Sequence, residues 1–424
     1  MKKLILAVAC AAVTGTSFAE NLTTEQRIHV LESELQRLKQ EISVQQSANI
    51  QLAQQQTQLN SELKSSAQKN INHLTDNVDV YGILRLDGAV DFKDTTAARG
   101  RTSNQINKVP FDAISGERSD FTIAATRFGV DIKNLAGRED VKAKLEADFW
   151  VDNGKGDGKL RIRHAYVSFD DWLLGQTWSL MSNMETMTES IDYTQFLGVS
   201  TSRLPQIRRD FNFNASNKLQ LALEYASDRT SELPALTAKY IYKNQAILLM
   251  GQAFINEKRA EVNQQDIDKV SWGIGLGARY KFTPQQSVQA NYYHVKGDQK
   301  FVSYTTQGSS SDGAAMGGDY SIDLNNNSLL LNEFDSLTFG YSHKLNDQWR
   351  GNIAASWMKF TDDNAYAKAN ITNNKQLTDH AINLIYTPRP YLDLGVEYHL
   401  GERESFEGKT ADISRVNLSA QYKF

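Results

Sequence analysis

The feature that most constrains the fold of this chain is a strict alternation of apolar and polar side chains. In the last twelve residues, Val416, Leu418, Ala420, Tyr422 and Phe424 share one parity, and the residues between them are polar or charged. Successive side chains of a β-strand point to opposite faces of a sheet, so this segment predicts a strand with one apolar and one polar face. A single strand of this kind also fits a soluble sheet, and the inference therefore depends on repetition.

The alternation recurs in about sixteen segments, an even number that predicts an all-β fold, a sixteen-stranded antiparallel transmembrane β-barrel. After the first twenty residues no stretch approaches the roughly 20 apolar residues of a membrane-spanning helix, which excludes a helical membrane protein. The predicted strands cover residues 78–92, 121–134, 141–151, 160–169, 172–178, 203–214, 218–226, 236–242, 246–256, 269–282, 287–295, 336–345, 348–360, 378–387, 391–400 and 413–424.

The predicted connections differ in length on the two sides of the barrel. Short turns at every second junction and long loops at most of the others are typical of outer-membrane barrels, whose chain ends lie on the periplasmic side. The expected long loops cover residues 93–120, 179–202, 257–268, 303–335 and 361–377. The side chains expected to form aromatic girdles at the two membrane interfaces are Tyr225, Tyr240, Tyr280, Trp349, Tyr386 and Tyr422.

The N-terminal residues predict export from the cytoplasm. Lys2 and Lys3 precede an apolar run, and Ser17-Phe18-Ala19 fits a signal-peptide cleavage site. We therefore expect a signal peptide over residues 1–19, a helical segment and linker over 20–77, and a barrel over 78–424. The single cysteine, Cys10, falls within the expected signal, so the mature chain has no disulfide and no thiolate ligand.

Composition narrows the classes of function further. The formal net charge is −4, which argues against a nucleic-acid partner. The histidines of the predicted barrel lie singly on different strands, and no nucleophile and base share a motif, so we predict no enzymatic activity and no cofactor. Gly273, Gly275 and Gly277 are spaced by two within a strand, which places them on the lumen face and not in a phosphate-binding loop. Residues 152–158 lack the ligand spacing of a calcium site and predict a hairpin loop.

The segment before the barrel predicts a long helix with an apolar seam. Residues 26–63 contain neither Gly nor Pro, and apolar residues recur at the a and d positions of a seven-residue repeat. The seam consists of Ile28, Leu31, Leu35, Leu38, Ile42, Leu52, Leu59 and Leu63. It predicts a coiled coil that joins several copies of the chain, and a spacer that does not self-associate is the alternative.

A barrel of sixteen strands encloses an aqueous channel, so its inward residues decide what passes. The basic residues that we expect to line the channel and bind anions are Arg85, Arg127, Arg161, Arg163, Arg208, Lys144, Arg279 and Arg350. Alternation places the guanidinium groups of Arg161 and Arg163 on one wall, about 7 Å apart. The alternative is that these residues pair with Asp87, Glu146, Asp148, Asp210 and Glu224 and brace the wall. Arg209 has the outward parity unless a bulge near Pro205 shifts it.

The long connection at residues 179–202 follows the fifth predicted strand. If this loop folds into the channel, its acidic residues Glu185, Glu189 and Asp192 form a constriction opposite the arginines. The alternative is a surface cap that is stabilised by its methionines.

Several motifs resemble those of one family of channels. They are Val80-Tyr81-Gly82, the run from Leu160 to Tyr166, the run from Leu174 to Trp178, and the terminal Tyr422-Lys423-Phe424. With the signal peptide and coiled coil, this pattern resembles the DcaP-like trimeric outer-membrane porins, and the helix is also similar to that of sucrose porins. The resemblance implies a homotrimer of sixteen-stranded barrels with periplasmic coiled coils. It implies dicarboxylates and other small anions as solutes, including some negatively charged antibiotics and β-lactamase inhibitors.

Three hypotheses of function remain open at this point. The first is passive diffusion of small carboxylates across the outer membrane. The second is a sugar channel, suggested by the helix and by the lumen aromatics Tyr81, Trp150 and Tyr293. The third is a structural tether whose coiled coil contacts peptidoglycan, and an outer-membrane hydrolase is a distant fourth. In each case we expect the barrel to contact outer-membrane lipid and lipopolysaccharide.

Overall fold

The protein was analysed as a computed structural model that describes residues 23–92, 106–111, 117–151, 158–226, 231–302 and 318–424, with the backbone alone at residues 27, 63–76 and 136. The expected signal peptide and most of the 152–158 loop lie outside these residues. The chain divides between Asp76 and Asn77 into two units. Among the described helices, none is both long and apolar enough to cross a membrane.

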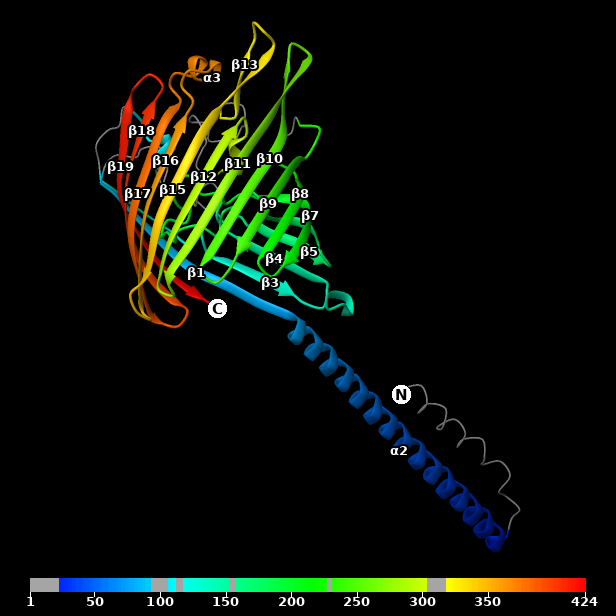
Figure 1. Ribbon diagram of the computed structural model, residues 1–424. Coiled ribbons are helices and arrows are strands. Elements are labelled where there is room, and N and C mark those ends of the chain that lie inside the picture. The colour runs from blue at the N-terminus through cyan, green and yellow to red at the C-terminus, as the bar shows by residue number, and fades with distance from the viewer. Residues whose placement is uncertain (1–22, 93–105, 112–116, 152–157, 227–230, 303–317) are drawn as a thin grey trace. The chain divides into compact units, whose positions relative to one another are not determined.

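The first unit contains the helix α2 and the second contains the sheet, with labels as in Figure 1. The elements are α2 (Thr24–Asn77), β1 (Val78–Asp91), η2 (Ile106–Lys108), β2 (Arg118–Thr122), β3 (Arg127–Ile132), η3 (Leu135–Gly137), β4 (Lys142–Asp148), β5 (Arg161–Phe169), β6 (Trp172–Trp178), β7 (Arg203–Asn214), β8 (Asn217–Glu224), β9 (Ala235–Lys243), β10 (Ile247–Val262), β11 (Gln265–Thr283), β12 (Gln286–Lys296), η5 (Gln299–Phe301), β13 (Tyr320–Asp323), β14 (Ser328–Leu331), β15 (Glu333–Lys344), β16 (Trp349–Phe360), α3 (Ala365–Ala369), β17 (Asn374–Arg389), β18 (Leu392–Ser405) and β19 (Thr410–Lys423).

The sheet closes on itself because the first and last strands pair. β1 runs antiparallel to β19, with Ile83 opposite Lys423 (Figure 1). The described residues contain seventeen strands in this sheet, but β2 and β3 pair with successive parts of β1 and are one interrupted strand. The result is a barrel of sixteen antiparallel strands preceded by a helix, which confirms the predicted fold class.

The interruption between β2 and β3 has a local cause. Residues 123–126 leave the ladder, and the hydroxyl of Thr126 replaces the lost backbone partners of Arg85. Its Oγ1 accepts a hydrogen bond from the Arg85 amide at 3.0 Å and donates to the Arg85 carbonyl at 3.2 Å. The displaced Ala124 and Ala125 pack against Trp150 inside the barrel.

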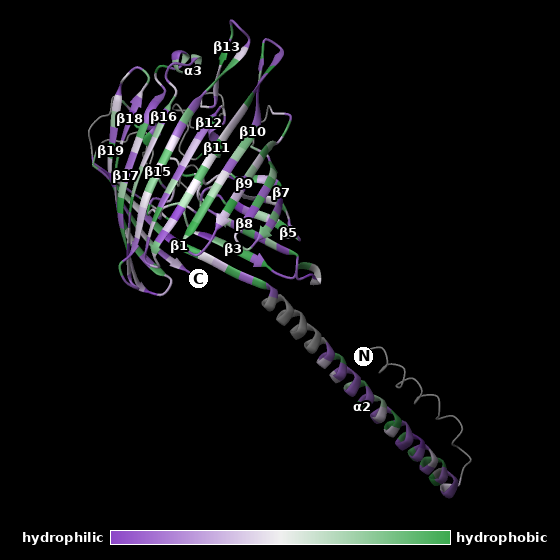
Figure 2. Cartoon of the chain, in the orientation of Figure 1, coloured by the Kyte–Doolittle hydropathy of each residue, from purple (hydrophilic) through white to green (hydrophobic). Residues whose placement is uncertain are grey.

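The alternation in the sequence becomes the outer and inner faces of the wall. On β1, Val80 is 68% exposed on the outside, whereas Asp87 is buried on the inside. A strand in a membrane must turn apolar side chains to lipid. Hydrophilic residues gather instead at the rims of the barrel and on α2 (Figure 2). The expected girdle residues Tyr225, Tyr240 and Tyr280 are exposed on the outer surface. Trp349 stacks on Tyr386 with ring centroids 4.5 Å apart.

One expected loop is wrong. Residues 257–268 continue β10 and β11 as a long hairpin, joined by Asn263 and Gln264. Both residues have positive φ, 51° and 63°, as a two-residue hairpin turn requires. Lys258 is fully buried between Asp298 and Asp319 at 2.9 and 2.7 Å, and this contact joins the extended strand to the connection that follows β12.

Irregularity occurs in β5 and not at Pro205. The register of β4 and β5 skips Arg163, so that Arg163 and His164 are both buried on the lumen side. Gln176 supports this bulge by donating hydrogen bonds from Nε2 to the carbonyls of Ile162 and Arg163, at 2.9 and 3.4 Å. The pairing of β6 with β7 continues through Pro205 without a shift, so Arg209 keeps its outward parity.

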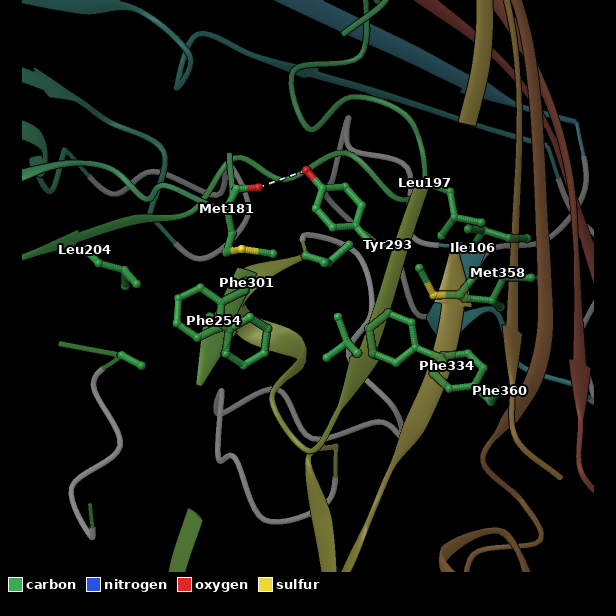
Figure 3. Packing of buried hydrophobic residues seen from close by; sticks show 14 of the residues in the cluster. Ile106, Met181, Leu197, Leu204, Phe254, Tyr293, Phe301, Phe334, Met358 and Phe360 are labelled. Carbon is green, nitrogen blue, oxygen red and sulfur yellow. Dashed lines mark hydrogen bonds between the residues drawn. The ribbon is translucent and has the colours of Figure 1, made fainter. Parts of the chain in front are cut away.

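Inward residues near the long-loop end form an apolar cluster within the barrel. Phe254 of β10 stacks on Phe301 of η5 at 4.3 Å, and Phe334 of β15 packs against Phe360 of β16 (Figure 3). Met181 from the 179–202 connection and Ile106 of η2 belong to the same cluster. Three connections that begin at the long-loop end therefore pack inside the barrel and occupy part of its cross-section.

The helix α2 begins with a capping box, in which Thr23 and Gln26 exchange hydrogen bonds between side chain and backbone. The predicted seam is solvent-exposed in the single chain, with Leu31 and Leu52 each 63% exposed. The side chain of Leu63 lies outside the described ones. Self-association through this seam stays a prediction.

Candidate functional site

Residues 179–202, which we call the inward loop, run inside the barrel along its wall. Near its start, Ser179 Oγ and the Leu180 amide donate to Glu224 of β8 at 2.6 and 2.7 Å. Further along, Tyr293 of β12 donates from its hydroxyl to the Met181 carbonyl at 2.8 Å (Figure 3). The loop then reaches β1, where Arg85 donates to the Ile191 carbonyl at 2.5 Å. The loop is therefore a lining of the lumen and not a surface cap.

Wall glycines provide the space in which the inward loop lies. Thr186 and Thr188 of the loop approach Gly277 of β11 and Gly340 of β15. A Cβ atom at Gly340 would lie 2.9 Å from Thr188 Cβ and 3.0 Å from its Cγ2. At Gly277 it would lie 2.7 Å from Thr186 Oγ1. A larger residue at either position would push the loop into the channel.

A buried group of charged residues holds the middle of the loop. Glu397 of β18 accepts hydrogen bonds from the amides of Ile191 and Asp192 and from Ser190 Oγ, at 2.9–3.0 Å. His399 lies between two carboxylates, with Nε2 2.7 Å from Glu397 and Nδ1 3.0 Å from Asp379. A doubly protonated imidazole donates to both carboxylates, and such charge-assisted bonds are the stronger kind.

Two of the three acidic residues predicted for the constriction pair with basic residues of the wall, and the third is bonded within the loop. Glu185 pairs with Lys239 of β9 at 2.9 Å. Glu189 pairs with Arg350 of β16 at 2.8 Å, and Arg350 also contacts Asp393. Asp192 is buried and accepts hydrogen bonds from Thr194, and burial raises its pKa. The charges of Glu185 and Glu189 therefore anchor the loop, and Lys239 and Arg350 of the wall offset them.

Opposite the covered wall, basic side chains gather into a group that we call the arginine wall. It consists of Arg85, Arg127, Arg161, Arg163 and Arg203, from β1, β3, β5 and β7. The carboxylates within it are Asp87, Glu146 and Asp148. Five arginines thus face three carboxylates, and two positive charges remain.

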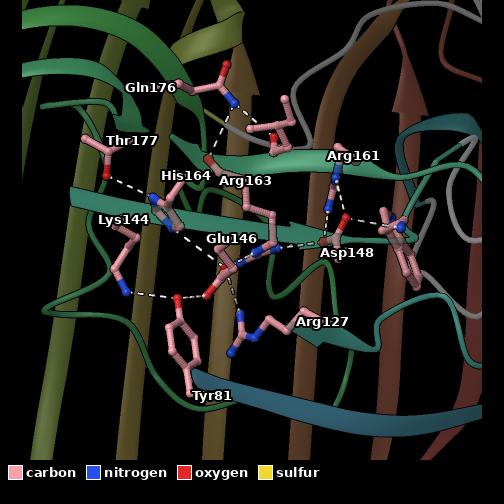
Figure 4. A network of polar contacts seen from close by, with 12 residues as sticks. Tyr81, Arg127, Lys144, Glu146, Asp148, Arg161, Arg163, His164, Gln176 and Thr177 are labelled. Carbon is pink, nitrogen blue, oxygen red and sulfur yellow. Dashed lines mark hydrogen bonds and ion pairs between the residues drawn. The ribbon is translucent and has the colours of Figure 1, made fainter. Parts of the chain in front are cut away.

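Arg161 and Arg163 share one carboxylate, as Figure 4 shows. Arg161 binds Asp148 through two hydrogen bonds, at 2.9 and 2.7 Å. Arg163 reaches Asp148 at 2.9 Å and Glu146 at 2.5 Å. Arg127 lies 3.9 Å from Glu146, a longer contact. The two guanidiniums of the Arg161–Ile162–Arg163 run therefore lie on one wall, and they are also braced by acids as the alternative expected.

Tyr193 of the inward loop completes the arginine wall. Its hydroxyl donates to Asp148 at 2.5 Å and accepts from Arg163 at 2.5 Å. Its ring lies 5.4 Å from the Arg85 guanidinium and 4.5 Å from the Trp150 ring. Burial raises the pKa of Tyr193, so the neutral hydroxyl is its stable form in the loop. The loop tip thus fixes the orientation of the arginines that border the open lumen.

Of the other predicted site residues, Lys144 is linked to this wall through Tyr81, whose hydroxyl contacts both Lys144 and Glu146, and the rest lie apart from it. Lys144 pairs with Asp131 at 2.9 Å and Arg208 with Asp210 at 2.9 Å. Arg350 is bound to the inward loop, as described above. Arg279 lies on β11, beside Gln289 of β12, and has no ion pair in the described part of the chain. The predicted set is therefore divided among several places along the lumen.

Arg203 was missed by sequence reasoning. It has the same parity as Arg209, which faces outward, so alternation alone assigns it to lipid. At the first residue of β7 the side chain instead lies over the Trp178 ring, with Cζ 4.4 Å from the ring centroid. The sequence offers one signal for this placement. Arg203 and Trp178 stand at the two ends of the long 179–202 connection, so pairing of the two strands brings the cation next to the aromatic ring.

The closed sixteen-stranded barrel, its inward loop and its charged lumen define an outer-membrane channel of the porin class. Proteins of this class are typically not enzymes. The chain belongs to the DcaP outer membrane protein family, whose sequence profile matches residues 13–424. This confirms the resemblance seen in the motifs.

Solved structures agree with this assignment. The outer membrane channel DcaP of Acinetobacter baumannii is 28% identical, with a TM-score of 0.73 over 82% of this chain and 97% of that one. OmpT of Vibrio cholerae in its trimer form is 11% identical, with a TM-score of 0.52 over 82% and 99%. An anion-selective porin from Comamonas acidovorans is also 11% identical, with a TM-score of 0.53 over 82% and 99%, and these two show the fold alone. A search of curated proteins finds no significant match.

Proposed function

We propose that this channel carries small anions, with carboxylates as the preferred solutes, by passive diffusion across the outer membrane. The observation that supports the proposal is the surplus charge of the arginine wall, where five arginines border the lumen with three carboxylates. Arginine binds carboxylates in a bidentate manner, and rings of basic residues select anions in other pores. The acids of the inward loop do not cancel this surplus, because Glu185 and Glu189 already pair with Lys239 and Arg350.

A dicarboxylate suits a site with several cations better than a monovalent ion does. Arg161 is one-third exposed to the lumen, whereas Arg163 is buried behind it. The exposed edge of this pair, together with the other arginines of the wall, offers a solute more than one cationic partner. Two carboxylate groups would then be desolvated and paired at the same time, which supports negatively charged antibiotics and β-lactamase inhibitors as further solutes.

Planar-bilayer recordings test the proposal. In a salt gradient, the reversal potential of the purified protein should show anion preference, and added succinate should reduce the chloride current in a saturable manner. A clear preference for cations would refute the proposed function. A current that oligosaccharides saturate, and succinate does not, would favour the sugar channel instead.

The sugar alternative receives little support from the lumen aromatics. Trp150 is buried under Tyr193, and Tyr293 is buried under the inward loop, where its hydroxyl bonds Met181. Tyr81 bonds Glu146 and Lys144. These three rings therefore do not form a continuous apolar path for a sugar within the described residues.

We also propose that the functional form is a homotrimer. The exposed seam of α2 requires partners to cover it. On the barrel, β4 and β6 have seven residues each, fewer than the roughly 9–11 that a tilted strand needs to cross a bilayer. This low part of the wall suits contact with neighbouring barrels, while lipid and lipopolysaccharide would cover the longer strands β10–β12 and β15–β19.

The remaining proposals concern the N-terminal part of the chain. We infer a signal peptide over residues 1–19, a coiled-coil segment and linker over residues 20–77 on the periplasmic side, and the barrel from Val78 onward. Peptidoglycan is a candidate partner of the coiled coil. Pelleting of the trimer with purified peptidoglycan, compared with a variant that lacks residues 24–62, tests whether the protein also acts as a tether.

A further inference from the structure

Arg203 differs from the other members of the arginine wall in having no acidic partner. Arg85 is paired with Asp87, and Arg161 with Asp148. Arg163 contacts both Glu146 and Asp148. In the part of the chain that the structure describes, Arg203 makes neither an ion pair nor a side-chain hydrogen bond, and the residue is partly buried. One of the two surplus positive charges of the wall is therefore at this residue, and Arg127, with a single contact of 3.9 Å to Glu146, accounts for the other.

The Trp178 ring holds Arg203 in place without neutralising it. The Arg203 guanidinium lies 4.4 Å from the ring centroid, and the Arg163 guanidinium lies 5.9 Å from the same ring. A cation–π contact is attractive but leaves the N–H donors of the planar group free for an anion. Arg161 and Arg163 both repel the charge of Arg203, so an anion that binds between them relieves this repulsion.

The position of Arg203 in the chain places it at the mouth side of the wall. Arg203 is the first residue of β7, Trp178 the last of β6 and Arg161 the first of β5. All three strand ends adjoin long connections. An anion that comes from the long-loop end therefore meets Arg203 and Arg161 near the start of its path along the wall.

We propose that Arg203, held on Trp178, is the residue that determines anion specificity and captures a carboxylate together with Arg161. This inference rests on the proposed anion channel and names the subsite where its selectivity arises. The arginines that are paired with carboxylates, by contrast, hold the side chains of the wall in place. An incoming carboxylate would accept hydrogen bonds from the free donors of Arg203 and from the exposed edge of Arg161.

A comparison of two arginines on the same strand tests this assignment. R203Q and R209Q remove the same charge from β7, but Arg209 is exposed on the outer face over Trp172, with Cζ 5.1 Å from that ring. In planar bilayers, R203Q should lose most of the anion preference and require about tenfold more succinate for half-maximal block, the loss expected for one charge-assisted hydrogen bond. R209Q should behave as the wild type in both measurements.

A third variant separates charge from geometry. R203K keeps the charge but not the planar, stacked donor group, so it should retain the anion preference and still bind succinate more weakly than the wild type. The proposal is overturned if R203K and R203Q both match the wild type, or if R209Q changes as much as R203Q does. If R203Q does not form stable trimers, the test depends on R203K. A succinate block of R203K equal to that of the wild type would then contradict the proposal. Cation preference in the wild type would instead refute the proposed function.

Discussion

The attachment of the inward loop to Glu397 allows a quantitative prediction. The two carboxylate oxygens accept five hydrogen bonds from Ser190, Ile191, Asp192, Asn383 and His399, at 2.7–3.0 Å. All five partners are donors. The substitution E397Q keeps the shape of the side chain but replaces one acceptor oxygen by an amide NH2 group, which can only donate.

The geometry determines the size of the effect. Oε1 faces Ser190, Asp192 and His399, and Oε2 faces Ile191 and Asn383. Whichever way the amide is placed, at least two donors lose their acceptor. Each unpaired buried donor costs about 1–3 kcal/mol, so E397Q should weaken loop docking by roughly 2–6 kcal/mol. Even the lower value changes the ratio of docked to undocked loop by about thirtyfold.

Hydrogen exchange and single-channel recording measure this change. Peptides that cover residues 185–197 should exchange faster in E397Q by about thirtyfold or more, because exchange follows the population of the opened loop. The open-channel current should become noisier as the loop leaves the wall and enters the channel. The control is E333Q, which makes the same chemical change at a carboxylate that pairs with Lys296 on the outer wall. Equal exchange in E397Q and E333Q would refute the account of loop anchoring.

Three further predictions concern other parts of the molecule. G340V should displace the inward loop and alter conductance, whereas G251V, at a glycine with open space around its α-carbon, should not; similar currents in both would contradict the seating of the loop. L35D in α2 should lower the temperature at which the trimer dissociates in detergent, as native gels can measure, because it places a charge in the seam; an unchanged temperature would argue against self-association. Burial, with the nearby charge of Asp298, raises the pKa of Asp319 from 3.8 to about 6 despite Lys258. A raised carboxyl pKa means stability that is full below the unfolded-state value and lost as pH rises through the folded one. The protection of the β13 and β14 amides against hydrogen exchange, corrected for the intrinsic exchange rate, should therefore fall between about pH 4 and 6. The substitution D319N should remove this pH dependence.

The alternation carried the prediction of the barrel because it depends only on neighbouring residues. A strand with Val80 and Leu84 on one face and Tyr81 and Arg85 on the other must have one side in lipid and one in water, whatever its partners are. The error at residues 257–268 has the same origin. The pattern of charges there resembles a loop, but Asn263 and Gln264 make a tight turn and the strands continue beyond the membrane.

The site was less accessible to such reasoning. Arg161 and Arg163 were predicted on one wall because a single residue, Ile162, separates them, and a local rule is enough for that. Their common partner Asp148 lies on another strand, and Tyr193 comes from a loop whose course depends on contacts with β8, β12 and β18. Arg203 has the outward parity, but a residue at the end of a strand is not bound by alternation, so only the structure places it over Trp178.

The amino-acid sequence by itself determined that this chain forms a membrane barrel with a polar interior, because burial in lipid or water acts on each side chain separately. Only the tertiary structure decided how that interior is divided. The inward loop follows the wall where glycines leave room and where Glu397, Lys239 and Arg350 offer charged partners, and these residues lie far apart in the sequence. The pairing of charges across strands is a matter of distance in space, and closure of the sheet sets those distances.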